Sequence, residues 1–262
     1  MKSFISALGL LTAFPVPSKW TSHLTTCSAY FPAVGFVLGC MYYGIAIGLD
    51  IIQVSGEWTS IVILLGMIFF TRALHMDGLA DMADGFGGGK NKDQILSIMK
   101  DSASGVFGVI SLAMLLLVKW MALTGIVKSE NHLSGVLAGM ISVVVVSRLS
   151  MTVLAGLFSY ARESGTGHII INHTSRKDVA IAVLLTMVLL VLFTGPASLI
   201  LMIVGCCISI LPGLYSQFKI NGITGDILGA ACEISEAALL VFLPFIQLNF
   251  YPDDWTGIIF LL

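Results

Sequence analysis

Charged residues are scarce in this chain, and its cysteines form no recognisable pattern. Asp, Glu, Lys and Arg make up 11% of the 262 residues, and the net charge of −2 argues against a nucleic-acid partner. The five cysteines include no Cys-x-x-Cys pair and no Cys/His spacing typical of zinc ligands. Linkers, low-complexity tracts and long polar segments are also lacking, so we interpret residues 1–262 as a single integral membrane domain.

Hydrophobic residues dominate what is present. They make up 57% of the chain, and the mean hydropathy is +0.97. Apolar runs of about 18 or more residues, long enough to cross a bilayer, recur throughout the sequence. The sequence therefore predicts an all-α, polytopic helical bundle with about seven transmembrane helices. The predicted spans cover roughly residues 29–50, 58–74, 105–127, 133–158, 178–195, 196–215 and 228–250.

The distribution of Lys and Arg indicates how these spans are oriented. If the N-terminus is cytoplasmic, Lys128 is the only basic residue in an outer loop. The basic residues expected on the cytoplasmic side are Lys2, Lys19, Arg72, Lys90, Lys92, Lys100, Arg162, Arg176, Lys177 and Lys219. This bias follows the positive-inside rule. We therefore expect a multi-pass protein of the bacterial inner membrane with a cytoplasmic N-terminus.

A group of acidic residues interrupts the apolar background. Asp77, Asp81 and Asp84 stand at positions i, i+4 and i+7, on one stripe of a helix with no Lys or Arg between them. Like charges on one stripe repel, and a divalent cation that prefers oxygen ligands, such as Mg²⁺, removes that repulsion. We predict a metal–diphosphate site at these residues, with His75 as a further catalytic candidate. The alternative is a solvated helix just outside the bilayer.

A second acidic group lies near the start of the last span. Asp226 and Glu233 are seven residues apart and share a helix face, so we predict that they face the first group across one polar cavity and complete the metal site. Alternatively, Glu233 and Glu236 are structural acids neutralised by Arg148 or by protonation. Arg148 is expected either to reach a substrate phosphate or to form an ion pair. Lys119 is expected to extend from its span to the membrane surface.

The motifs of this sequence resemble those of the cobalamin synthase family, the adenosylcobinamide-GDP ribazoletransferases, over nearly the whole chain. The most specific motif joins the acidic stretch His75-x-Asp77-Gly-Leu-Ala-Asp81-x-x-Asp84-Gly to a downstream Met-Lys100-Asp101-Ser. The other motifs are Phe14-Pro-Val-Pro17, Phe31-Pro32-x-x-Gly35, Gly105-x-Phe-Gly108, Ser147-Arg148, Ala161-Arg162 and Thr224-Gly-Asp226-x-x-Gly-Ala-x-x-Glu233.

This resemblance implies a reaction and its participants. Adenosylcobinamide-GDP is joined to α-ribazole or its 5′-phosphate with release of GMP, as a ribose hydroxyl attacks the phosphate nearest cobinamide. Mg²⁺ is the expected cofactor, because diphosphate chemistry needs charge neutralisation. Within the motifs we expect Lys100, Asp101, Arg148 and Arg162 to bind substrate, and either a carboxylate or His75 to accept the hydroxyl proton. The lipid bilayer is the other expected partner, and homo-oligomerisation stays open.

Three other functions agree with part of the pattern. A CDP-alcohol phosphotransferase or a prenyltransferase also uses Asp-rich membrane helices, but the former carries Asp-Gly-x-x-Ala-Arg, whereas Asp81 follows Ala80 here. A transporter also carries acids within its spans, but repeats and broken helices near the midplane are then expected. The sequence pattern indicates neither, and the acids cluster on one side of the membrane. A purely structural membrane subunit does not need the acidic stripe.

Overall fold

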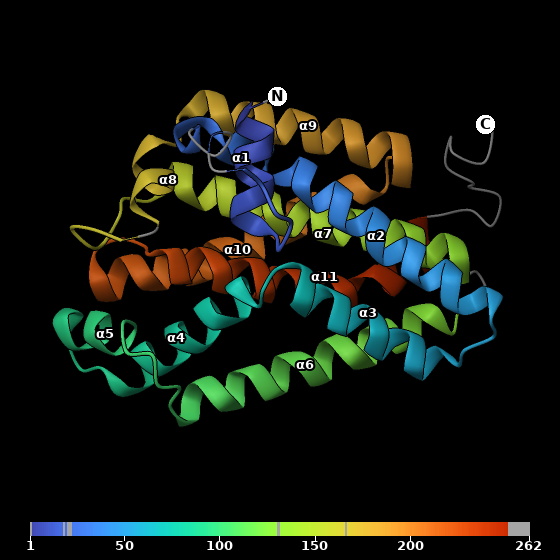
Figure 1. The fold of residues 1–262 in the computed structure, drawn as a ribbon, viewed down its shortest axis with the longest axis horizontal. Helices are drawn as coiled ribbons and strands as arrows, with labels where there is room; N and C mark the ends of the chain where they lie inside the picture. The colour runs from blue at the N-terminus through green and yellow to red at the C-terminus, as the bar shows by residue number, and fades with distance from the viewer. Residues whose placement is uncertain (1, 18, 20–22, 130–131, 166, 251–262) are drawn as a thin grey trace.

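The structure, a computed structural model, describes residues 2–17, 19, 23–129, 132–165 and 167–250. This part of the chain is helical apart from connecting segments and one isolated bridge, which confirms the predicted all-α class. The elements are α1 (Lys2–Leu11), η2 (Leu24–Thr26), η3 (Ser28–Tyr30), α2 (Phe31–Ile51), α3 (Gly56–Phe70), α4 (Leu74–Gly88), α5 (Lys92–Ile98), α6 (Val106–Val127), α7 (His132–Leu157), α8 (His168–His173), α9 (Arg176–Thr194), α10 (Ser198–Ile220) and α11 (Gly225–Phe250) (Figure 1).

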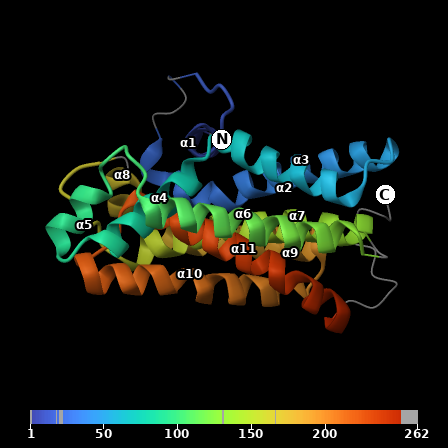
Figure 2. The same cartoon turned by 90° about the horizontal axis from the view of Figure 1, so that it is seen from below.

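The helices long and apolar enough to cross a membrane agree with the predicted spans. Among the described residues, 6 helices pass this test alone, and the bent pair of α3 and α4 raises the number to as many as 7. The long helices run side by side (Figures 1 and 2). Helices α5 and α8 lie at one end of the bundle, and the α2–α3 and α6–α7 connections lie at the other. Most of the basic segments assigned to the cytoplasm are therefore at one end, opposite Lys128.

The core of the bundle is formed by α7 and α11. In the most apolar 18-residue stretch of each helix, 83% of the α7 residues and 72% of the α11 residues are buried. Helices α6 and α9 are largely peripheral, with side chains such as Met121 (70% exposed) and Leu184 (63% exposed) pointing outward. In a bilayer these outward side chains face lipid because they are apolar. The helices tolerate this environment because each satisfies its own backbone hydrogen bonds.

A sharp break divides the second predicted span. Helix α3 ends at Phe70 and α4 begins at Leu74, and the two helices meet at 84°. Arg72 and Ala73, between them, have left-handed φ values of 54° and 52°, which non-glycine residues rarely adopt. The guanidinium Nη2 of Arg72 donates to the carbonyl of Gly9 at 3.3 Å, linking the end of α1 to this bend. The bend turns α4 toward α11 and α6, against which it packs.

Candidate active site

Three acids lie near the place where α4 packs against the first turn of α11. Asp77 and Asp81 come from α4, and Asp226 is the second residue of α11. Asp81 is half-buried and lies within electrostatic range of both Asp226 and Asp77. A Cβ added to Gly78 would lie 2.7 Å from the backbone oxygen of Asp226, so the two backbones approach closely at this point. We call Asp77, Asp81 and Asp226 the acid cluster.

Arg162 is the basic partner of this cluster. Its Nη2 donates to Oδ2 of Asp226 at 2.9 Å, and the hydroxyl of Thr224 donates to the same oxygen at 3.1 Å. The loop carrying Arg162 is fixed to the α10–α11 turn by two backbone hydrogen bonds. The N–H of Ala161 donates to the carbonyl of Ile223 at 2.9 Å, and the N–H of Ile223 donates to that of Ser159 at 2.8 Å. The arginine therefore reaches the acids from a tethered loop.

Tyr160 stands in the same loop as Arg162, and His168 is the first residue of α8. The rings of Tyr160 and His168 pack edge to face with their centroids 5.5 Å apart. Burial raises the pKa of the Tyr160 phenol above its usual value, so this hydroxyl stays neutral near pH 7. The sequence pattern gave no signal for a role of Tyr160, because single hydroxyl residues in a turn are common. Thr224 is part of the Thr224-Gly-Asp226 motif, but the motif did not indicate a role for its hydroxyl.

Asp84 lies on the same stripe of α4 as Asp77 and Asp81 but has a different environment. It is 8% exposed, and each of its carboxylate oxygens accepts a backbone N–H. Gly105 donates to Oδ2 at 2.7 Å, and Gly108 donates to Oδ1 at 2.9 Å. Gly105 is the N-cap residue of α6 and Gly108 lies in its first turn. Asp84, more than 20 residues earlier in the chain, therefore caps the N-terminus of α6.

His75 points away from the acid cluster. It is two positions from Asp77 on α4, which corresponds to about 200° around the helix. The side chain is 1% exposed, its Nδ1 lies 3.9 Å from the thiol of Cys232, and its Nε2 has no hydrogen-bond partner among the described residues. The structure thus places His75 in the protein interior between α4 and α11.

A buried group of four charges crosses the interior of the bundle. Lys119 of α6 donates to Glu233 Oε2 at 2.5 Å and to Glu236 Oε1 at 2.6 Å. Arg148 of α7 donates to the other oxygen of Glu236, which also accepts the hydroxyl of Ser147 at 3.1 Å. These four charged residues are at most 4% exposed. We call Lys119, Arg148, Glu233 and Glu236 the buried tetrad.

The buried tetrad corrects one prediction and specifies another. Lys119 is 2% exposed, so the prediction that it extends to the membrane surface is wrong. The acids of α11 draw its ammonium group inward, because an ionised Glu in the apolar interior needs a partner. Arg148 forms its ion pair with Glu236. Glu233 lies two turns deeper along α11 than Asp226, about 10 Å along the helix axis, beside Lys119.

Lys100 and Asp101 lie on the exposed turn between α5 and α6. Oδ1 of Asp101 accepts the backbone N–H of Ala103 at 3.1 Å, which stabilises the turn locally. This turn leads directly to Gly105, one of the two residues held by Asp84. The two side chains therefore project from a segment attached to α4 near the acid cluster.

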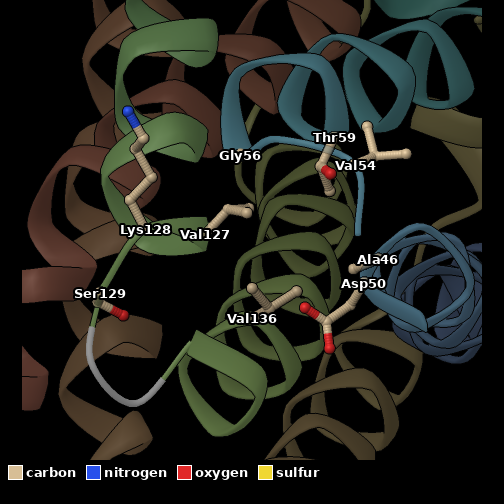
Figure 3. Close-up of a pocket in the computed structure, with 9 residues that line it drawn as sticks. All are labelled: Ala46, Asp50, Val54, Gly56, Thr59, Val127, Lys128, Ser129 and Val136. Atoms are coloured by element: carbon tan, nitrogen blue, oxygen red, sulfur yellow. The ribbon is translucent and has the colours of Figure 1, made fainter. Parts of the chain in front are cut away.

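A cavity of about 190 Å³ lies at the opposite end of the bundle (Figure 3). The residues that line it include Asp50, Thr59 and Lys128, and the ammonium group of Lys128 pairs with Glu57, which does not line the cavity. The acids of α4 and the first acid of α11 do not line it. We therefore separate this cavity from the candidate active site.

The acid cluster suits a magnesium ion in its donor chemistry. In the described part of the chain, no three His, Cys, Asp or Glu side chains lie close enough to hold a metal ion by themselves. Mg²⁺ prefers oxygen donors, and proteins commonly hold it through one or two carboxylates while substrate phosphates and water complete its coordination. The carboxylates of the cluster are donors of the kind that would share such an ion with substrate phosphates.

Comparison with known proteins places the chain in a family. The family model described as cobalamin-5-phosphate synthase matches residues 3–244. A Prosthecochloris aestuarii protein named adenosylcobinamide-GDP ribazoletransferase is 36% identical over 96% of this chain and 100% of its own length. Proteins of the same name from Chlorobium phaeovibrioides and Syntrophobacter fumaroxidans are 37% and 35% identical, over 90% of this chain and 94% and 96% of their own lengths. No solved structure matches the chain significantly. The chain belongs to the cobalamin-5-phosphate synthase family and is a membrane-embedded transferase of cobalamin biosynthesis.

Proposed function

We propose that this chain joins adenosylcobinamide-GDP to α-ribazole or its 5′-phosphate at the acid cluster. The observation that carries this assignment is the Arg162–Asp226 ion pair at one end of the bundle, with Asp81 within electrostatic range of both groups. Opposite charges placed together in this way suit a diphosphate with its counter-ion, because the acids hold a divalent cation and the arginine contacts phosphate oxygens. The name of the relatives supplies the identity of the two substrates.

The residues of the acid cluster hold and orient the diphosphate. One or two of Asp77, Asp81 and Asp226 would bind Mg²⁺, which when bound supplies charge neutralisation to the phosphates. Arg162 uses one N–H on Asp226, and its guanidinium carries further donors that suit the leaving phosphate. Lys100, on the turn held by Asp84, is the other cation that we assign to the phosphates.

The transfer itself exchanges one phosphorus–oxygen bond for another. The ribose hydroxyl oxygen forms a bond with the phosphorus nearest cobinamide, and the bond from that phosphorus to the bridging oxygen breaks. GMP leaves with the bridging oxygen, and the hydroxyl proton passes to a carboxylate of the acid cluster. We assign the proton to a carboxylate because His75 is 1% exposed and points to the opposite side of α4.

Substitution of Asp81 tests this proposal. Asp81→Asn keeps the size of the side chain and removes its charge, and we expect turnover to fall at least about a hundredfold, as when a main electrostatic element is lost. Asp93→Asn is the matched control, because Asp93 is exposed on α5. Both variants should insert and purify normally. Near-normal turnover of Asp81→Asn at saturating Mg²⁺ would exclude the acid cluster as the reaction site.

We also propose that this end of the bundle faces the cytoplasm of a bacterial cell. The charge bias of the loops supports this orientation, since Lys90, Lys92 and Lys100 lie on the same side as the acid cluster. Cysteines introduced singly at exposed positions 93 and 163, in a variant without native thiols, should be protected from a membrane-impermeant maleimide in intact cells. Labelling of both without permeabilisation would reverse the assignment.

A further inference from the structure

Asp84 differs from the other acids of its stripe in what its carboxylate contacts. Both of its oxygens accept backbone N–H groups at the beginning of α6, from Gly105 at 2.7 Å and Gly108 at 2.9 Å. We propose that Asp84 is a positioning residue that fixes the N-terminus of α6 and the preceding turn against α4, and that metal binding is left to the acid cluster. This inference rests on the proposed function only for its magnesium measurement.

The beginning of α6 needs an acceptor from elsewhere. The first N–H groups of a helix have no partner inside it, and a Ser, Thr, Asp or Asn at the N-cap usually supplies one. Here the N-cap is Gly105, which has no side chain. Asp84 takes this role from α4, and its negative charge is favourable at the positive end of the α6 dipole. The carboxylate thus satisfies donors that the local sequence leaves open.

The space around the carboxylate is matched to glycine. A Cβ added to Gly105 would lie 2.5 Å from Oδ1 of Asp84, and one added to Gly108 would lie 2.3 Å from Oδ2. Both distances are shorter than any normal non-bonded contact. The two glycines of the Gly105-x-Phe-Gly108 motif and the third Asp of the acidic motif therefore form one structural unit, although they are more than 20 residues apart.

This unit controls the surroundings of Asp81. Asp84 is one helical turn from Asp81, and the turn held by Asp84 carries Lys100 and Asp101. Because Asp84 of α4 holds Gly105, it determines the position of the α5–α6 turn, and so of Lys100 and Asp101, relative to the acid cluster. Loss of the Asp84 contact is therefore expected to misplace the turn and lower turnover, without changing how tightly the remaining acids bind Mg²⁺.

A double-mutant cycle tests the contact directly. Asp84→Ala removes the acceptor, and Gly108→Ala forces a methyl group onto the carboxylate, so each substitution should lower the melting temperature of the full-length protein in detergent by several degrees. Because Asp84→Ala also removes the group that clashes with Ala at position 108, the two effects should be clearly less than additive. Fully additive effects would overturn the proposed contact. Gly125→Ala, at a helix position with open space around the added Cβ, is the control.

The magnesium dependence of turnover separates positioning from ligation. Asp84→Asn should lower the maximal rate while leaving the Mg²⁺ concentration for half-maximal rate within about twofold of the original. Asp81→Asn should instead raise that concentration, or abolish turnover. A tenfold or larger rise for Asp84→Asn would make Asp84 a ligand and overturn the inference. If Asp81→Asn retained normal turnover, the proposed function would fail, while the thermal cycle would still decide the role of Asp84.

Discussion

Neutralising Glu236 tests the buried tetrad. This carboxylate is 1% exposed and accepts hydrogen bonds from Lys119, Arg148 and Ser147. Glu236→Gln leaves two buried cations with one buried anion, since Glu233 is then the only acid of the tetrad. Removing one partner of a buried ion pair typically costs about 3–5 kcal/mol, because the remaining charge is uncompensated. For a protein of this size, that corresponds to a fall in melting temperature on the order of 10 °C.

The measurement is thermal unfolding of the purified protein in one detergent at one pH. Glu57→Gln is the matched control. Glu57 also pairs with a lysine, Lys128, but both of these side chains are about half exposed, at the end of the bundle opposite the acid cluster. Exposed pairs contribute little to stability because water and salt screen them. We expect the control to melt within about 2 °C of the original protein, the range usual for surface substitutions.

A compensating substitution gives the second arm. Adding Lys119→Met to Glu236→Gln restores a neutral interior, with Arg148 and Glu233 left as the buried ions. The double variant should therefore regain a large part of the lost melting temperature. The reasoning is refuted if Glu236→Gln and Glu57→Gln melt alike, or if Lys119→Met lowers the melting temperature of Glu236→Gln still further.

Two further predictions concern the acid cluster. Arg162→Lys should raise KM for adenosylcobinamide-GDP about tenfold or more. A lysine cannot reproduce the guanidinium fork, and a hydrogen bond to a charged group contributes about 1.5–3 kcal/mol. Arg176→Lys, at the exposed start of α9, is the control and should leave KM unchanged. Gly78→Ala would place a Cβ 2.7 Å from the backbone oxygen of Asp226. We therefore expect it to reduce turnover and to destabilise the folded protein by about 1–3 kcal/mol, the usual range for overpacking. Equal turnover and stability of Gly78→Ala and Gly125→Ala would contradict this expectation.

The apolar runs predicted the number of spans but not the shape of the second one. The predicted span 58–74 ran through the break at which α3 ends and α4 turns away by 84°. Breaks in helices are usually signalled by Gly or Pro, and here Arg72 and Ala73 adopt the left-handed conformation instead. Arg72 contacts the end of α1 through its hydrogen bond to the carbonyl of Gly9, and a tertiary contact of this kind leaves no local pattern in the sequence.

The acidic stripe predicted a helix but not the different environments of its members. Asp77, Asp81 and Asp84 do lie on one helix, α4, as their spacing indicates. Spacing fixes the face of a helix, but not which neighbour each side chain meets along it. Asp81 lies within electrostatic range of Asp226, whereas Asp84 accepts hydrogen bonds from the beginning of α6, and those bonds depend on how α4 and α6 pack. The role of Lys119 was hidden for the same reason, because the rotation of α6 decides whether its ammonium group faces lipid or protein.

The tetrad and the acid cluster are connected through α11. Asp226 stands in the first turn of this helix, and Glu236 lies ten residues further, about 15 Å along the axis. A slip of α11 by one residue turns it by about 100° and would carry Asp226 away from Asp81. Apolar replacement of a complete buried ion network is often neutral for stability. We therefore expect a variant with Lys119→Met, Arg148→Met, Glu233→Leu and Glu236→Leu to remain folded but to turn over more slowly, because the ion pairs of the tetrad then no longer help to fix the rotation of α11. Unchanged turnover in that variant would show that packing and the contacts of Asp226 set the register without the tetrad.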